Sequence, residues 1–354
     1  MLFLSEEEKR DWAGYAGEVF RDELSPGYCD AEIRKNLVPA FHFYIATLLA
    51  AKGRGDLGAR WLESGTLVEE DGLFGCGYLL GFLERHGGRL EMPAMPFQDP
   101  RPFIHFAGVP AMKEARHQFI RQCGHSLPEF DHPARFMDIG CGDGALTVAL
   151  LSHLVETGKV PRFSEVLLID QSAAMADLAR TTVGSAFPET TVNVKNSRIQ
   201  NCSHSIDHHY DIAVSSLAYH HMPVEVKKVH LSRLKLWIDH LILFEMDAHN
   251  DTPELFSPDL ALSVYQSYSR IIDFIFTHDA PVDLAIDCVD SFMMAEIVSL
   301  LTQRRGTRLD YHMLRGQWHS LFRDVLCPEF SCRCDSSAYA DEYMTLFTLH
   351  YGRD

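Results

Sequence analysis

The stretch that most constrains this chain is FMDIGCGDG, which runs from Phe136 to Gly144. Phe136, Met137 and Ile139 suit a short buried strand, and the glycines after them suit a turn without side chains. Residues 145–154 then carry apolar side chains at helical spacing. A strand, a glycine loop and a helix in this order allow a ligand to approach the backbone closely. The stretch therefore predicts an α/β fold with a nucleotide-binding loop.

The charge of this loop distinguishes between nucleotide ligands. Gly140, Gly142 and Ala145 also match GxGxxA, a loose dinucleotide-binding pattern that would allow a nicotinamide-dependent reductase. A pyrophosphate at this turn would face two carboxylates, Asp138 at the end of the strand and Asp143 within the loop. A ligand with a cationic amino group would instead be attracted to them. The acidic residues therefore favour a cationic ligand over a dinucleotide.

An acidic residue followed by GxGxG is the first motif of the class I S-adenosylmethionine-dependent methyltransferases, and this chain resembles that family. A second apolar strand, residues 166–169, ends in Asp170 and opens a DxSxxM run, as in the family. The resemblance implies S-adenosylmethionine as the cofactor, with Asp170 on the ribose hydroxyls and Gln171 and Met175 beside the adenine. It further implies cofactor contacts from the first motif and the fourth strand, namely Asp138, Gly140, Gly142, Gly144 and Ser215.

The resemblance covers roughly residues 110–354, apart from a divergent stretch between about 250 and 310. It implies a Rossmann-like sheet of seven strands, with strand four and its loop at residues 210–223, strand five at 241–245 and a last antiparallel strand at 343–351. One feature departs from the family, because no acidic residue follows the strand at 191–194. Asn196 or Ser197 is expected to make the adenine contact instead.

Helical patterns fill the amino-terminal part of the chain, and no strand pattern precedes Arg135. Ser5 and Glu8 form a capping box for a first helix, and a second helix is expected from about Asp30 to Lys52. The prolines between 93 and 110 are expected to interrupt helix formation and mark a boundary. We therefore predict a helical cap or dimerisation module at 1–95 and a methyltransferase domain at 96–354.

Residues 251–308 interrupt the alternation of strands and helices with a mainly helical, aromatic and acidic insertion. An aromatic lid would enclose a small molecule and exclude water, which makes Tyr265 and Phe292 candidate acceptor-binding residues. Tyr311 and Arg315 lie where the insertion rejoins the fold, and Arg315 could hold a substrate carboxylate. The alternative is that the aromatic residues are core and Arg315 is solvated.

Candidate catalytic residues follow the fourth and fifth strands. His220 and His221 lie where the family places the transferred methyl group, and either could accept a proton, although a purely structural role is the alternative. Glu245 and His249 are further candidates for binding the acceptor or its proton. A metal is not expected, because Glu245, Asp247 and His249 alternate along an extended chain and do not converge.

Composition limits the remaining possibilities. A formal net charge of −17 and the lack of clustered Lys and Arg argue against a nucleic-acid partner. Neither a signal sequence nor a membrane span is apparent, so the sequence predicts a cytoplasmic protein with a small-molecule substrate and no membrane partner. The function predicted is methyl transfer to oxygen rather than nitrogen. The alternatives are a cofactor-binding module without turnover and a non-methylating enzyme that uses S-adenosylmethionine. The helical module could form a homodimer.

Overall fold

The computed structural model describes residues 2–21, 24–93, 99–202 and 206–354. Contacts within the chain define two compact units. The helical unit comprises Met1–Pro96, Ala248–Tyr311 and Glu342–Met344. The sheet unit comprises Phe97–Asp247, His312–Asp341 and Thr345–Asp354. The chain therefore leaves the sheet unit after Asp247 and re-enters it at His312.

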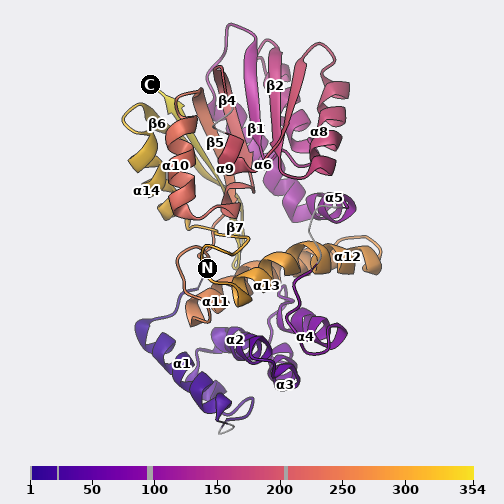
Figure 1. Ribbon diagram of the computed structural model, residues 1–354, viewed down its shortest axis with the longest axis vertical. Coiled ribbons are helices and arrows are strands. Elements are labelled where there is room, and N and C mark those ends of the chain that lie inside the picture. The colour runs from indigo at the N-terminus through magenta and orange to yellow at the C-terminus, as the bar shows by residue number, and fades with distance from the viewer. Residues whose placement is uncertain (1, 22–23, 94–98, 203–205) are drawn as a thin grey trace. The chain divides into compact units, whose positions relative to one another are not determined.

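The sheet unit is built on a seven-stranded sheet with the order β3-β2-β1-β4-β5-β7-β6 (Figure 1). Strands β1 to β5 are parallel, whereas β7 is antiparallel to both β5 and β6. The expected Rossmann-like α/β fold of seven strands is confirmed. The strands are β1 (Ala134–Ile139), β2 (Phe163–Asp170), β3 (Thr191–Asn196), β4 (Tyr210–Ser216), β5 (Ile238–Met246), β6 (Phe330–Ala340) and β7 (Thr345–Arg353).

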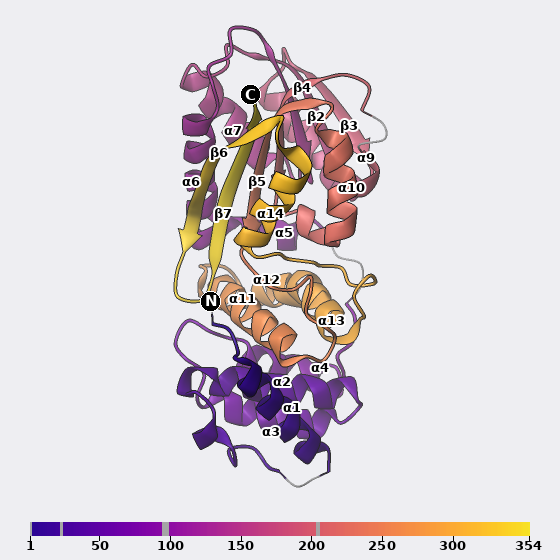
Figure 2. The ribbon, with the colours of Figure 1, turned by 90° about the vertical axis from the view of Figure 1, so that its left-hand side faces the viewer.

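Helices cover both faces of this sheet, so its central strands are almost entirely buried. Phe136, Ile169 and Phe244 are each 0% exposed, as expected for strands that lie between two helical layers. Figure 2 shows α6 and α7 on one face and α9, α10 and α14 on the other. The helices of this unit are α5 (Arg101–Gly108), α6 (Pro110–Ser126), α7 (Ala145–Glu156), α8 (Ala173–Ala186), α9 (Ile199–Cys202), α10 (Val224–Leu234) and α14 (Arg315–Leu326).

The helical unit joins the amino-terminal helices to the insertion, which supplies α11 to α13. Helix α2 is buried along nearly its whole length and packs against α3 and α11. No strand precedes Ala134 in the described residues, as predicted. The helices are α1 (Glu6–Phe20), α2 (Val38–Ala51), α3 (Gly55–Thr66), α4 (Cys76–Arg85), α11 (Pro258–Thr277), α12 (Val282–Cys288) and α13 (Met294–Thr302), with a π-helical turn at Val289–Met293.

Two helix predictions need correction, and proline explains both. The second helix does not run unbroken from Asp30, because Pro39 cannot donate to the carbonyl four residues earlier; α2 begins at Val38, after two short 3₁₀ turns. Conversely, the proline-rich stretch contains α5, with Pro102 in its first turn, where proline is tolerated. The capping box of Ser5 and Glu8 at α1 is confirmed.

The described residues contain no helix that is both long and apolar enough to cross a bilayer.

A buried pair of histidines makes the stability of the sheet unit depend on pH. His350 of β7 is 0% exposed, its Nε2 lies 3.0 Å from His240 Nδ1, and its Nδ1 lies 2.8 Å from Ser126 Oγ. Burial and the nearby His240 lower the pKa of His350 to about 3, from 6.5. The unfolded chain therefore binds a proton between these values that the folded chain does not bind.

We expect the free energy of unfolding to fall as the pH drops from 6.5 towards 3, by at most about 1.4 kcal/mol per pH unit from this residue. The stabilisation is fully present above pH 6.5. Urea unfolding at a series of pH values checks this, with His350→Gln expected to flatten the profile and His117→Gln, on the surface of α6, expected to leave it unchanged. Parallel profiles for His350→Gln and the wild type would contradict the prediction.

Candidate active site

The glycine loop has a backbone that only glycine adopts readily. Gly140, Gly142 and Gly144 have φ angles of +82°, +55° and +78°. A Cβ atom at Gly140 would lie 2.3 Å from Ala218 Cβ, and one at Gly144 would lie 2.9 Å from Ala179 Cα. The loop therefore packs directly against the segment after β4 and against α8. It leaves a backbone surface with no side chains of its own, as the sequence predicts.

Asp138 lies at the end of β1 and has one buried carboxylate oxygen whose hydrogen-bonding capacity is not satisfied. It is 4% exposed, and its Oδ2 accepts a hydrogen bond from the Thr147 hydroxyl of α7. Its Oδ1 is buried and has no partner among the described residues. Burial raises the pKa of this carboxyl group to about 7, while the Thr147 hydrogen bond and the charge of Arg116 act in the opposite direction. A cationic ligand group would satisfy Oδ1 and restore the carboxylate.

Asp170, at the end of β2, lies at the entrance to the same loop. Its Oδ2 accepts from the Gly142 N–H at 3.1 Å, and its Oδ1 accepts from the Ser172 N–H at 2.8 Å. Each carboxylate oxygen has a second lone pair and can still accept a ligand hydroxyl. Asn196 Nδ2 donates to the Asp170 carbonyl at 3.1 Å, and the Ser197 N–H donates to it at 3.0 Å. Both thus fix the turn that carries Asp170, and their expected adenine contact stays a prediction.

The other predicted cofactor residues surround this loop. Met175 is 1% exposed on α8, and its methyl group would lie 3.8 Å from a Cβ atom at Gly142. Gln171 is exposed just before α8. Ser215 is 0% exposed on β4, next to Ile139 of β1, and its hydroxyl has no partner among the described residues.

Sequence reasoning missed Phe103 of α5, whose ring would lie 3.0 Å from a Cβ atom at Gly142. Because the prolines around it were expected to exclude a helix, no sequence signal placed an aromatic side chain over the glycine loop. Its position makes one wall of the loop apolar. The buried acceptors, the bare backbone and this apolar wall fit a nucleoside ligand with a cationic amino group.

Glu245 and His220 form a buried pair at the adjacent strand ends. Glu245 is 1% exposed on β5, and its Oε1 accepts from the N–H groups of Ala218 and His220, both at 3.2 Å. Its Oε2 lies 2.9 Å from Nδ1 of the His220 ring. The pair forms because Ser216 of β4 lies beside Phe244 of β5, so the loop after β4 begins next to Glu245. Leu217 makes this turn with a φ of +49°, which is strained for a non-glycine residue.

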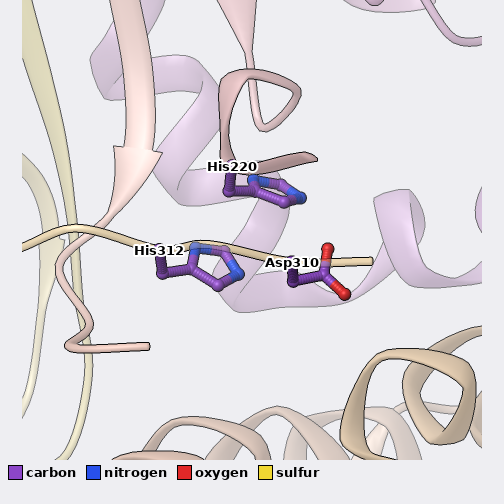
Figure 3. A group of neighbouring side chains, drawn as sticks. All are labelled: His220, Asp310 and His312. Carbon is purple, nitrogen blue, oxygen red and sulfur yellow. The ribbon is translucent and has the colours of Figure 1, made fainter. Parts of the chain in front are cut away.

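A second imidazole stacks on this pair. The His312 ring lies 4.2 Å from the His220 ring at an angle of 25°. Figure 3 shows the two rings facing each other. It is 3% exposed, and burial together with the charge of His220 lowers the pKa of His312 well below its usual value. His312 is therefore neutral at physiological pH. It was not among the predicted site residues, although it follows Tyr311 in the segment that rejoins the fold.

The structure separates the two histidines after β4. The His221 ring meets the His220 ring edge to face at 4.2 Å, and the charge of His221 favours the ionised form of Asp170. The charge of His221 thus acts on Asp170 as well as on Glu245, whereas the His220 ring is held by Glu245. The structure thus brings together three of the four predicted catalytic residues. The fourth, His249, lies in the helical unit, where its N–H donates to Ser263 Oγ at 3.0 Å.

The predicted acceptor-binding residues are divided between the two units. Tyr265, Phe292 and Tyr311 belong to the helical unit, where Tyr265 is 2% exposed and donates its hydroxyl to Glu69 Oε1 at 3.0 Å. Arg315 belongs to the sheet unit and pairs with Asp335 of β6. Their role in binding an acceptor stays a prediction.

Comparison with known proteins agrees with this geometry. Residues 137–238 match a family model described as a methyltransferase domain. No curated protein matches the chain. Among solved structures, SCL7 from Oryza sativa is similar, with 14% identity over 87% of this chain and 99% of that chain and a TM-score of 0.55.

Two further structures are similar at lower TM-scores. Magnesium protoporphyrin IX methyltransferase (ChlM) from Synechocystis PCC 6803, with bound SAH, shares 14% identity over 72% of this chain and 93% of that chain, with a TM-score of 0.41. The plantazolicin methyltransferase BpumL, in complex with SAH, shares 12% identity over 73% of this chain and 92% of that chain, with a TM-score of 0.44.

The matched residues contain the glycine loop, Asp138, Asp170 and the His220 segment, on a sheet with the expected order of strands. The site geometry meets the requirements of the cofactor that the sequence implies. The chain therefore contains a methyltransferase domain at residues 137–238.

Proposed function

We propose that the protein methylates a hydroxyl oxygen of a small molecule, with His220 as the general base. The observation that carries this proposal is the buried pair of His220 and Glu245 beside the glycine loop. The cofactor supplies a methyl group that is already electrophilic, because it is bound to a sulfonium. The protein therefore has to align the acceptor and remove its proton.

Glu245 determines which nitrogen of His220 can act. A carboxylate oxygen 2.9 Å from Nδ1 is best satisfied when Nδ1 carries the proton and donates it. Nε2, on the opposite side of the ring, is then the unprotonated nitrogen that can accept a proton. The same pairing stabilises the imidazolium that forms when Nε2 takes the acceptor proton, as in other carboxylate–histidine arrangements.

The acceptor atom follows from this need for a base. An alcohol or phenol is a poor nucleophile until its proton is removed, whereas a carboxylate is already ionised at neutral pH. A buried and oriented base is therefore most useful for a hydroxyl acceptor. A net charge of −17 supports a small molecule rather than a nucleic acid.

Incubation with methyl-labelled S-adenosylmethionine and a panel of phenols, alcohols, amines and carboxylic acids tests the proposal. We expect label in a hydroxyl compound, with equimolar S-adenosylhomocysteine and a rate that falls at acidic pH. Transfer only to amines or carboxylates would overturn the proposal. Tight cofactor binding without transfer to any class would instead favour a binding module.

Asp170→Ala is expected to weaken binding of S-adenosylhomocysteine by about 1–3 kcal/mol, because it removes the acceptor of the ribose hydroxyls. Isothermal titration calorimetry measures this. The control is Asp177→Ala, on the exposed side of α8, where the carboxylate pairs with Arg180 at 2.9 Å. Undiminished affinity in Asp170→Ala would show that the ribose lies elsewhere.

A further inference from the structure

Helix α10 carries a charged side chain at a core position. Its buried face is formed by Lys227, His230, Leu231 and Leu234, at the spacing of one helical stripe. Lys227 is 0% exposed. Burying an ammonium group costs several kcal/mol unless other groups compensate its charge, so a lysine at this position needs a physical explanation.

The surroundings of Lys227 supply that compensation. Its Nζ lies 4.8 Å from the centre of the Trp318 ring of α14, within the range of a cation–π interaction. Its charge also acts on Glu245, favouring the carboxylate, and on His312, favouring the neutral ring. Lys227 lies in the first turn of α10, which begins at Val224, directly after the segment that carries His220. The same Trp318 ring lies 6.1 Å from the ring of Tyr219, the residue before His220, so the ammonium group lies beside the segment that carries the proposed base.

Glu245 needs such a charge. Burial is the largest influence on its pKa and raises it, whereas His312, Lys227 and His221 act in the opposite direction. His312 is held neutral, so it contributes less positive charge than Lys227 near neutral pH. If Glu245 became protonated, it would donate to Nδ1, and the proton of a neutral His220 would have to sit on Nε2. That tautomer has no lone pair for the acceptor.

We propose that Lys227 is a positioning residue: its buried ammonium keeps Glu245 a carboxylate and so holds His220 in the Nδ1–H tautomer that can act as a base. This rests on the proposed function of His220. Lys227 touches neither acceptor nor cofactor in this role and acts only through Glu245. Among the described residues, the charges that act on Glu245 include those of His221 after β4, Lys227 of α10 and His312 before α14, and the His220 ring lies 2.9 Å from its Oε2.

The tautomer of His220 can be measured without any acceptor. Nitrogen-15 chemical shifts of the imidazole distinguish a protonated from an unprotonated ring nitrogen, and the His220→Asn spectrum identifies which signals belong to His220. In the wild type at neutral pH we expect a protonated Nδ1 and an unprotonated Nε2. Lys227→Met, which keeps the apolar stem, should give a mixed or reversed tautomer, whereas Lys227→Arg should keep the wild-type pattern.

The pH profile of kcat/KM gives a second measurement. Removing a positive charge makes the Glu245–His220 pair hold its extra proton more tightly, so the acid limb in Lys227→Met should move to higher pH by about 1 unit. Lys227→Arg should restore the wild-type midpoint. In a Glu245→Gln background, Lys227→Met should shift the midpoint by much less, because the carboxylate is already absent. Lys227→Gln serves the same purpose if the methionine variant does not fold.

The outcomes separate the two proposals. A wild-type His220 with its proton on Nε2 would overturn the role of His220 itself. A wild-type Nδ1–H tautomer that is unchanged in folded Lys227→Met, with an unmoved acid limb, would overturn only the role of Lys227. An equal shift in the presence and absence of Glu245 would show that Lys227 does not act through that carboxylate.

Discussion

Replacing His220 with asparagine is expected to lower kcat by about 10²–10⁴-fold and to flatten the acid limb of the pH profile, which is the usual contribution of general-base catalysis. Asparagine keeps a donor at the position of Nδ1 but cannot accept a proton. The KM for the cofactor should change little, because Asp138, Asp170 and the glycine loop stay in place. Steady-state kinetics across pH 5–9 measures both effects.

Two control variants show whether the effect is specific to His220. His221→Asn should retain most of kcat, since the Glu245 carboxylate holds the His220 ring at 2.9 Å. His209→Asn, which removes a partly exposed partner of Asp239, should leave kcat unchanged. If His220→Asn kept the wild-type kcat and pH profile, His220 would be a structural residue, and the proton would be removed by another group or not at all.

Gly140→Ala is expected to lower the free energy of unfolding by about 2–4 kcal/mol, because a φ of +82° is strained for alanine and the new methyl group overlaps Ala218. The overlap distance of 2.3 Å between the two Cβ atoms forces the His220 segment or the loop to move. We therefore also expect at least about a tenfold loss of S-adenosylhomocysteine affinity, or about 1.4 kcal/mol. Urea unfolding and calorimetry measure the two effects.

Gly184→Ala is the matched control for this substitution. Gly184 lies within α8 with nothing within 4 Å of the Cβ position, and its φ is not positive. Alanine is the better helix former, so this variant should be more stable by about 0.5–1 kcal/mol. If Gly140→Ala behaved like Gly184→Ala, the tight packing of the loop against Ala218 would be wrong.

Features that depend on short stretches of chain could be predicted from the sequence. The glycine loop is one, because positive φ angles at Gly140, Gly142 and Gly144 follow from local residue types. The buried strands are another, because continuous apolar runs bounded by Asp138 and Asp170 indicate a parallel sheet. The capping box at Ser5 is a third. In each case the residues that determine the structure lie within a few positions of each other.

The pairings within the site could not be predicted in the same way. Glu245 and His220 are 25 residues apart, and their contact depends on the register of β4 against β5. His312 joins them only because the chain returns to the sheet after the insertion. Lys227 has the sequence character of a solvated residue, and only the packing of α10 against α14 shows that it is buried. Such features depend on tertiary contacts between distant segments.

The insertion shows the same limit at a larger scale. Its aromatic and helical character could be recognised from the sequence, but α11 packs against α2, more than 200 residues earlier in the chain. Periodicity indicates that a helix has an apolar face and does not indicate which element will cover it. The lid role of residues 251–308 and the pairing of subunits through the helical module stay predictions for this reason.

Calorimetric titration with S-adenosylhomocysteine, alongside an identical titration with NAD, tests the central claim most directly because it requires no knowledge of the acceptor. A methyltransferase domain with an unsatisfied buried acceptor at Asp138 and a proposed ribose-binding carboxylate at Asp170 predicts saturable one-to-one binding of S-adenosylhomocysteine and no saturable binding of NAD. Saturable binding of NAD, with none of S-adenosylhomocysteine, would contradict the account.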